Sequence, residues 1–154
     1  MTLKLSWRKT FRRLHLYLGL SVGVLLTIIT LSGSILVYYP QIDLLLNPAN
    51  DATTNIKTPN WDQAYNTLRA NFPSKQGPWR LENTGINSVI PARYYNPIET
   101  KEQGFAPLMV WLSSSSDKVI RKNYWGKYLV TWMYNLHFSL LTGATGTLVV
   151  GYIG

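Results

Sequence analysis

Two long apolar stretches enclose a polar middle in this chain. Residues 15–39 contain no Asp, Glu, Lys or Arg, and Pro40 follows them. The 24 residues from Leu16 to Tyr39 would form a helix of about 36 Å at roughly 1.5 Å per residue, whereas the hydrocarbon core of a bilayer is about 30 Å thick. The pattern therefore predicts a transmembrane helix at residues 15–39, ended by the proline.

The second apolar stretch, residues 127–154, is uncharged from Tyr128 onward and predicts a second span. Trp132 and Tyr134 near its start are typical of an outer lipid interface, which would place His137 about one helical turn below that surface. The stretch ends at the last residue without a polar or basic stop. This ending suggests a truncated chain whose further helices are missing, although a two-span protein is the alternative.

Small residues recur at a spacing of four in both apolar stretches. They are Gly19 and Gly23 in the first stretch, and Gly143, Thr147 and Gly151 in the second. Such spacing lets another helix approach closely, so it favours a helix bundle with partner helices. Glycine is also common in membrane helices generally, and the sequence leaves both interpretations open.

Residues 40–126 have the pattern of a small folded module with a linker before it, starting near Pro59. In WDQAYNTLRANFP, the residues Trp61, Tyr65, Leu68 and Phe72 lie at helical spacing, which predicts a helix whose aromatic ends anchor a core. Between residues 74 and 124, Gly and Pro separate four runs typical of strands: WRLEN, INSVIPARYYN, FAPLMVWL and KVIRKNYW. The last two runs flank SSSSD, which predicts a hairpin.

The expected fold class is therefore an α+β membrane protein, with two transmembrane helices flanking a helix packed on a small antiparallel sheet. Several aromatic residues of the module are open to two interpretations. They fill its core or lie at the lipid boundary, or they stack on a planar ligand, and the sequence alone does not distinguish these. The residues are Trp79, Tyr94, Tyr95, Trp111, Tyr124 and Trp125.

The charge is distributed unevenly along the chain, whose formal net charge is +8. The first acid is Asp43, whereas five basic residues precede the first apolar stretch: Lys4, Arg8, Lys9, Arg12 and Arg13. Short basic flanks stay in the cytoplasm, so residues 1–14 predict a cytoplasmic tail and residues 40–126 an extracytoplasmic module. Nucleic acid would also bind such a cluster, but membrane topology explains it more simply, and no nucleic-acid partner is expected.

A cleaved signal peptide is the main alternative for the first stretch. The apolar run is about twice the usual signal core of roughly 7–15 residues, and YYPQIDLL after it offers no small-residue cleavage site. A retained anchor is therefore expected. The chain has no cysteine, which excludes disulfides, thiolate metal sites and cysteine nucleophiles.

Two motifs in the apolar stretches resemble those of bacterial PepSY-associated transmembrane proteins. WRKTFRRLHLYLGLSVGVLLTIITLSGSILVYYPQIDLLLNP is similar to the family's first span, and NLHFSLLTGATGTLVVGYIG resembles the LH-x-x-LL-x-G-x-x-G opening of its second span. The helix and hairpin of the middle look like a PepSY-type module, although SSSSD departs from the usual D-x-x-T-G turn. The resemblance covers nearly the whole chain but only the front part of a family that usually has further spans.

The resemblance implies an inner-membrane protein of iron uptake, of the siderophore-reductase type, in which membrane histidines hold b-type haem. His15 and His137, the only histidines, match the motif positions and would be axial ligands of haem iron. Imidazole is a natural axial ligand, and a polar side chain retained in a span indicates function by default. Gly19, one turn after His15, would leave room for a macrocycle, whereas Leu141 occupies that position after His137. Without the resemblance, a histidine at a lipid interface is simply a boundary residue.

The predicted depths of the two histidines separate them. His15 opens the first span on the inner side, and His137 enters the second from the outer side, across a core about 30 Å thick. They cannot ligate one iron, so each would serve a different haem, with its second ligand from a missing helix. The chain by itself is expected to bind haem weakly and to be inactive.

Two function classes follow. The first is a haem electron carrier that reduces an external iron(III)-siderophore or similar acceptor, a ferric-siderophore reductase in enzymatic terms. The second is a membrane-anchored PepSY module that binds or regulates another protein without redox chemistry. A b-type haem band in the visible spectrum would distinguish them.

Overall fold

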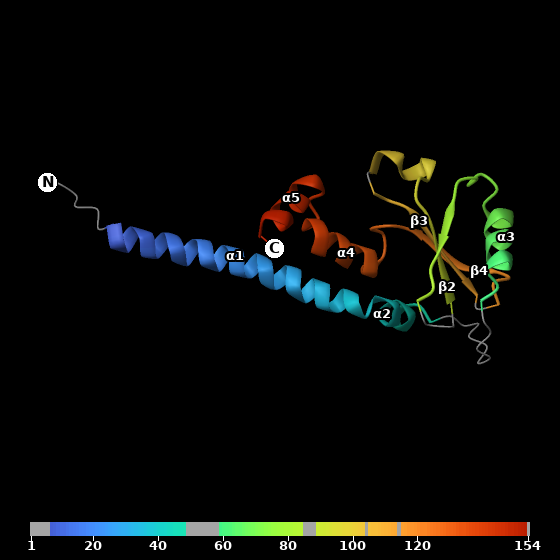
Figure 1. Cartoon of the computed structure of the whole chain (residues 1–154), viewed down its shortest axis with the longest axis horizontal. Coiled ribbons are helices and arrows are strands. Elements are labelled where there is room, and N and C mark those ends of the chain that lie inside the picture. Colours follow the sequence, from blue (N-terminus) through green and yellow to red (C-terminus); the bar gives the residue numbers. More distant parts are fainter. Residues whose placement is uncertain (1–6, 49–58, 85–88, 104, 114, 154) are drawn as a thin grey trace. The chain divides into compact units, whose positions relative to one another are not determined.

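The computed structural model describes residues 7–48, 59–84, 89–103, 105–113 and 115–153. Along the described chain, helices precede and follow a run of strands (Figure 1). The chain divides into two compact units: a helical unit of Met1–Val37 with Met133–Gly154, and a sheet unit of Tyr38–Trp132. We describe each unit by itself.

The helical unit begins with α1, a continuous helix of 31 residues from Trp7 to Val37. It starts before the apolar stretch because the basic segment contains no helix breaker. Its hydroxyl side chains bond to carbonyls one turn back, as Ser21 Oγ does to the Tyr17 oxygen at 2.8 Å and Thr27 Oγ1 to the Gly23 oxygen at 2.8 Å, so the helix carries them without unpaired polar groups. The helix is long and apolar enough to cross a membrane, as predicted.

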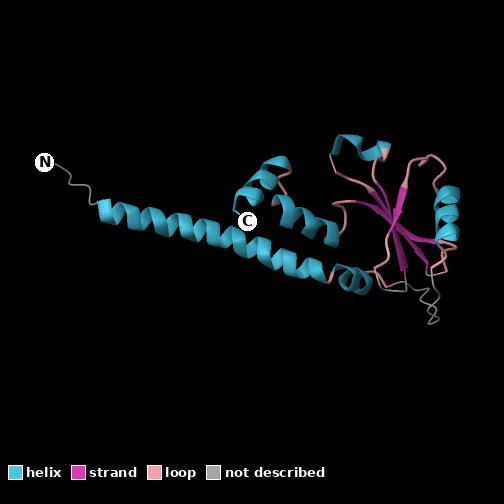
Figure 2. Ribbon diagram, viewed as in Figure 1, coloured by secondary structure: helices cyan, strands magenta, loops and turns pink. Residues whose placement is uncertain are grey.

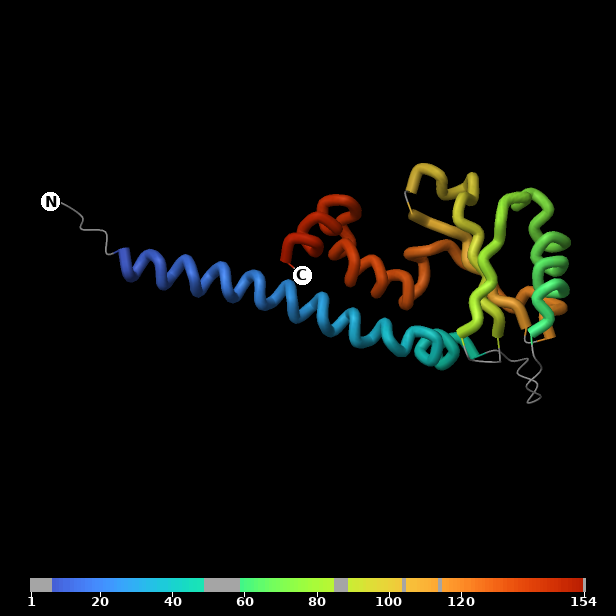
Figure 3. Tube along the Cα trace, in the orientation of Figure 1, coloured from blue at the N-terminus to red at the C-terminus, as the bar shows by residue number. Residues whose placement is uncertain are grey.

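The second apolar stretch differs from the single helix that we expected. It forms α4 (Leu129–Ser139) and α5 (Ala144–Ile153), which are bent by 60° at a break between them; Figure 3 shows the chain turning sharply there. Leu140, Leu141 and Gly143 have φ values of 48°, 62° and 64°, and this left-handed backbone interrupts the helical hydrogen bonds. The two helices together qualify as one broken span or a re-entrant loop.

Gly146 in the first turn of α5 lies very close to the end of α4. A Cβ atom at this position would lie 1.7 Å from the Ser139 carbonyl oxygen and 2.4 Å from Thr142 Oγ1. No other residue type fits there without a shift of backbone, since every other side chain begins with a Cβ atom. Gly146 therefore permits the bend.

The sheet unit contains four antiparallel strands, as the sequence predicts, and their order in the sheet is β1-β2-β3-β4. The strands are β1 (Trp79–Leu81), β2 (Val89–Tyr94), β3 (Leu108–Ser113) and β4 (Val119–Tyr124). Figure 2 shows helix α3 (Trp61–Asn71) beside this sheet. With a long apolar helix, a possible bent second span and this sheet, the chain has the α+β class expected of it.

The core between α3 and the sheet corrects one detail of the sequence analysis. Leu68 is fully buried, as expected, but its helical neighbour in the core is Ala64, and Trp61 is 38% exposed. Phe72 is partly buried against this core. The helix presents a small residue and Leu68 to the sheet because Ala64 allows a closer approach, so Trp61 is not a core anchor.

The opposite face of the sheet is also buried, because Met109 and Trp111 of β3 are 4% and 3% exposed. The short helix α2 (Tyr39–Leu46) contributes Asp43, which forms an ion pair with Arg121 of β4. The Arg121 guanidinium lies 3.6 Å from the ring centre of Trp111. Alternation along β3 thus places aliphatic residues on one face and an aromatic and charged cluster on the other.

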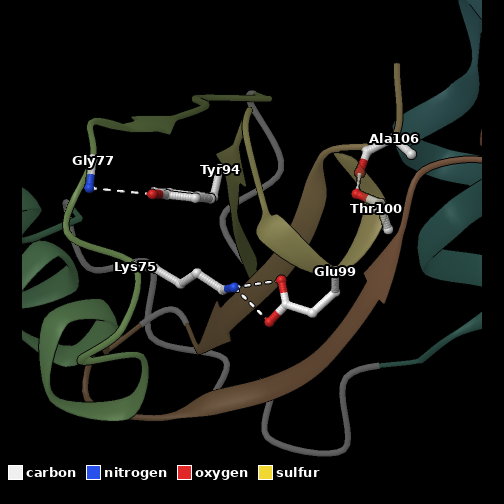
Figure 4. A network of polar contacts seen from close by, with 6 residues as sticks. All are labelled: Lys75, Gly77, Tyr94, Glu99, Thr100 and Ala106. Atoms are coloured by element: carbon white, nitrogen blue, oxygen red, sulfur yellow. Dashed lines mark hydrogen bonds and ion pairs between the residues drawn. The ribbon is translucent and has the colours of Figure 1, made fainter. Parts of the chain in front are cut away.

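A second polar network connects the end of α3 to the 3₁₀ helix η1 (Ile98–Gln103). Figure 4 shows the Lys75 ammonium directed at the Glu99 carboxylate, with 2.6 Å from Nζ to Oε1. The Thr100 hydroxyl donates to the Ala106 carbonyl at 2.6 Å, and Gly77 N–H donates to the Tyr94 hydroxyl at 3.3 Å. These bonds attach the loop between α3 and β1, and the segment between β2 and β3, to the rest of the sheet unit.

Candidate functional site around His137

His137, which the sequence singled out, lies on α4 and packs against α1 within the helical unit. Its neighbours on α1 are Ile29, Ser32 and Gly33, which share one face because they are separated by three and four positions. Ser32 is 2% exposed and is the one buried residue of α1 in the described chain. The histidine thus lies at the place where α1 is most closely covered.

The hydrogen bond to Ile29 determines which ring nitrogen of His137 carries the proton. Nδ1 lies 2.9 Å from the Ile29 carbonyl oxygen. A carbonyl oxygen only accepts, so Nδ1 must be the donor, and in the neutral imidazole the other nitrogen, Nε2, then carries the lone pair. Among the described residues, Nε2 has no hydrogen-bond partner. The ring is therefore oriented with one nitrogen anchored and one available.

Ser32 completes a small polar cluster. Its hydroxyl donates to the same Ile29 carbonyl at 2.8 Å and lies 3.3 Å from Nδ1 of His137. Because the serine proton is engaged by the carbonyl, its oxygen is left as a second, weaker acceptor for the Nδ1 proton. The carbonyl and the hydroxyl thus favour the same protonation of the ring.

The ring of His137 fits against α1 only because residue 33 is glycine. A Cβ atom at Gly33 would lie 2.7 Å from Cε1 of His137, 3.2 Å from Nδ1 and 3.4 Å from Nε2. On the other side, the ring meets Phe138 edge-on with centroids 5.0 Å apart, and Phe138 stacks on Tyr134 at 4.3 Å. Packing and hydrogen bonding thus define the position of the imidazole together.

His15, the other predicted ligand, has a different environment. It is exposed on α1, and no hydrogen bond or ring contact engages it in the described part of the chain. Ile29 follows it by 14 residues, which is about 21 Å along a helix at roughly 1.5 Å per residue. The structure therefore does not bring the two histidines together. A Cβ at Gly19 would meet nothing within 4 Å, so the space expected beside His15 is present.

The helical unit contains one oriented imidazole, which is the kind of donor that an axial haem site uses. The described residues contain no group of three or more His, Cys, Asp or Glu side chains that could hold a metal. An axial haem ligand needs only one imidazole with a free nitrogen, and ligating histidines usually donate their other N–H to a carbonyl or carboxylate. His137 meets both requirements. For His15, the structure provides space but no orienting partner within the described residues.

The aromatic residues of the sheet unit contact one another. Trp79 packs between Phe72 and Tyr94 at centroid distances of 5.6 and 5.2 Å, and Trp111 meets Tyr128 at 5.2 Å. Trp111 is also nearly fully buried. These contacts favour the core interpretation over stacking on a planar ligand.

Two ion pairs lie on the buried charged face of the sheet unit. Arg93 pairs with Glu82 at 3.1 Å, beside the pair of Asp43 and Arg121. Burial raises the pKa of Asp43 above its ordinary value, and the Arg121 guanidinium opposes this rise only in part. Sequence analysis missed these pairs, because their members are 11 and 78 positions apart along the chain and come together only on folding.

Sequence analysis also missed the three α1 residues that orient His137. The adjacent Ser32 and Gly33 were the available signal, because this small pair interrupts a run of large apolar residues. Such a pair permits close helix contact, but nothing in the chain identified His137 as the side chain that occupies it.

Comparisons with known proteins place these residues in a wider group. A family model described as the PepSY-associated TM region matches residues 12–154, nearly the entire chain. No curated protein and no solved structure matches.

Proposed function

Since the chain belongs to the PepSY-associated TM region family, we propose that it is a haem-binding electron-transfer protein of the bacterial inner membrane that serves iron uptake. The observation that carries the proposal is the geometry of His137. The Ile29 carbonyl oxygen accepts a hydrogen bond from Nδ1 at 2.9 Å. The lone pair of Nε2 is therefore left to ligate iron. The long apolar helix α1 and the possible bent second span would supply the lipid-embedded setting that such a group requires.

His137 would bind haem iron through Nε2. The hydrogen bond from Nδ1 to Ile29 makes the imidazole a stronger electron donor and restrains its rotation. Haem b supplies one-electron chemistry between the ferric and ferrous states when it is bound. The half-buried position of His137 limits the access of water, which favours a stable axial ligand.

His15 would serve a second haem. Its separation of about 21 Å along α1 from the His137 contact rules out a shared iron, so two haems would form a relay across the membrane. The second axial ligand of each would come from another helix, in agreement with the open faces of α1, where Gly19 and Gly23 meet nothing within 4 Å.

The acceptor would be an iron(III)-siderophore or a similar complex on the outer side. Each iron(III) takes one electron and becomes iron(II), which binds most siderophore donors less firmly because of its lower charge. The four described basic residues at the start of α1 support a cytoplasmic amino terminus, with the sheet unit in the periplasm: Arg8, Lys9, Arg12 and Arg13. A reporter fused near residue 100 should be active only outside the cytoplasm.

The visible spectrum of the full-length protein tests the proposal. Purified from haem-replete cells, the protein should show a reduced b-type band. His137→Ala and His15→Ala should each remove a different haem and leave the other spectrally intact, while Gly151→Ala, at an open position, should retain both. Loss of all haem in either histidine variant that still folds would refute the relay.

A second function is favoured by one observation on the sheet unit. Ile98, the first residue of η1, and Phe105, two residues after its end, are 81% and 56% exposed, although large apolar side chains are favourable to bury. They would suit a module that binds or regulates another protein without redox chemistry. Absence of any haem band from haem-replete cells would favour this function over electron transfer.

A further inference from the structure

We infer that the Ile29 carbonyl and Gly33 are the positioning elements of His137, and that they hold its imidazole in the form with a proton on Nδ1 and a lone pair on Nε2. This inference deepens the proposed function and rests on it, because an imidazole held in this way is prepared to ligate iron. The carbonyl and Gly33 both act through the histidine.

The hydrogen bond provides the first part of the argument. The acceptor is a backbone carbonyl, which no substitution of the Ile29 side chain removes, and the distance of 2.9 Å from Nδ1 is that of a normal hydrogen bond. The Ser32 hydroxyl donates to the same oxygen, so it cannot at the same time donate to Nδ1. The protonation of the ring is therefore imposed by α1 before any ligand binds.

The close approach at Gly33 provides the second part. The hydrogen bond requires the ring to lie against α1, and a Cβ at residue 33 would come within 2.7 Å of Cε1, well inside van der Waals contact. The atom that must yield is in the histidine ring, at the end of a side chain. An alanine at this position would therefore rotate or displace the ring, and the bond to Ile29 would be lost.

The same helix offers a matched control. Gly23 also lies within α1, and a Cβ there would meet nothing within 4 Å. Gly23→Ala and Gly33→Ala thus make the same chemical change to the same helix, with the same gain in helix propensity. They differ in the contact with His137.

Nitrogen NMR of the imidazole tests the inference without haem. The chain has two histidines, so the 154-residue chain with His15→Gln, labelled with ¹⁵N-histidine and placed in lipid bilayers, reports on His137 alone. We expect a protonated Nδ1 and an unprotonated Nε2, a pattern that Gly23→Ala retains and Gly33→Ala loses. An Nε2 proton in the parent chain, or an unchanged pattern in Gly33→Ala, would overturn the inference.

Ser32→Ala keeps the inference testable if Gly33→Ala does not fold. The variant removes the hydroxyl but retains the carbonyl acceptor, so the Nδ1 proton should persist. A proton that moves to Nε2 in this variant would show that the hydroxyl, rather than the Ile29 carbonyl, positions the ring, and would overturn the inference.

Haem content of the full-length protein separates this inference from the proposed function. Loss of a histidine's supporting hydrogen bond typically weakens metal binding by about 10–100-fold, so Gly33→Ala should weaken the His137 haem by this factor and leave the other haem intact. Gly23→Ala should change neither. If the NMR pattern is as expected but the unaltered protein binds no haem, the proposed function fails while the positioning of His137 stands. If Gly33→Ala binds haem at His137 normally, the positioning role is wrong.

Discussion

The Lys75 ammonium is paired with the Glu99 carboxylate at 2.6 Å from Nζ to Oε1, although Lys75 is only 6% exposed. The main chain of Lys75 is also engaged, since its carbonyl accepts from Arg69 Nη1 at 3.2 Å and from Trp79 Nε1 at 3.3 Å. One residue thus joins α3, β1 and η1. A buried ammonium is tolerated because its charge has a partner.

Glu99→Gln should therefore destabilise the sheet unit. The buried ammonium would lose its counter-charge, and an under-satisfied buried donor costs about 1–3 kcal/mol; the half-exposed position of Glu99 places the loss toward the lower value. Urea titration of the full chain in detergent, followed by tryptophan fluorescence, measures it. Glu102→Gln, on the same 3₁₀ helix and exposed, is the control. Equal stability of the two variants would contradict the role of the pair.

The same pair should make the sheet unit acid-sensitive. The hydrogen bond from Lys75 lowers the pKa of Glu99 below its ordinary value of 4.5. The folded state therefore binds this proton less readily than the unfolded state, so the stabilisation is complete above about pH 4.5 and is lost as the pH falls through the lowered pKa. Glu99→Gln should reduce the slope of stability against pH in this acidic window. An unchanged slope in Glu99→Gln would show that other groups cause the loss of stability in acid.

Asp43 should give the opposite slope, because burial raises its pKa above the ordinary value of 3.8. The folded state binds this proton more readily, so the contribution of Asp43 is complete below pH 3.8 and is lost as the pH rises through the raised pKa. Asp43→Asn should remove this contribution to the slope, and at pH 7 it should destabilise the sheet unit, because it leaves the largely buried Arg121 guanidinium without its counter-charge. Asp117→Asn is the contrast, since hydrogen bonds from Ser113 and Ser115 lower the pKa of Asp117. An unchanged slope of stability against pH in Asp43→Asn, or equal stability of this variant and the unaltered chain at pH 7, would contradict this reasoning.

Leu68→Ala should unfold the sheet unit far more readily than Trp61→Ala. Leu68 is fully buried between α3 and the sheet, and truncating such a leucine typically costs about 2–5 kcal/mol. Trp61 is 38% exposed and buries less of its surface against neighbours. Protease resistance of the sheet unit in the full chain compares the two. If Trp61→Ala were more sensitive to protease than Leu68→Ala, the aromatic face of α3 would form the core after all.

Gly146→Ala should change the break between α4 and α5. The added Cβ would lie 1.7 Å from the Ser139 oxygen, so α5 would have to move away from the end of α4. Electron-spin distances between labels on the two helices should shift in Gly146→Ala but not in Gly151→Ala, where a Cβ meets nothing within 4 Å. Identical distances in both variants would mean that the bend does not depend on this close approach.

Hydrophobic pattern alone was sufficient for the first helix and for the helix α3 and the strands of the sheet unit. Spacing predicted α1, α3 and all four strands, because helical and strand periodicity are local properties of the chain. It failed at the break in the second apolar stretch, where Leu140 and Leu141 adopt positive φ. Leucine seldom does so, and nothing in the uncharged run indicates that tertiary packing imposes it.

The candidate site shows the same division between sequence and structure. The sequence by itself singled out His137, because a titratable side chain in an apolar stretch is rare, and it separated His137 from His15 by their positions in different stretches. Only the tertiary structure decided that Ile29, Ser32 and Gly33 surround His137, since these residues are more than 100 positions away from it. The hydrogen bond to Ile29 and the close approach at Gly33 depend on atoms that only folding brings together. A local sequence pattern therefore cannot predict them.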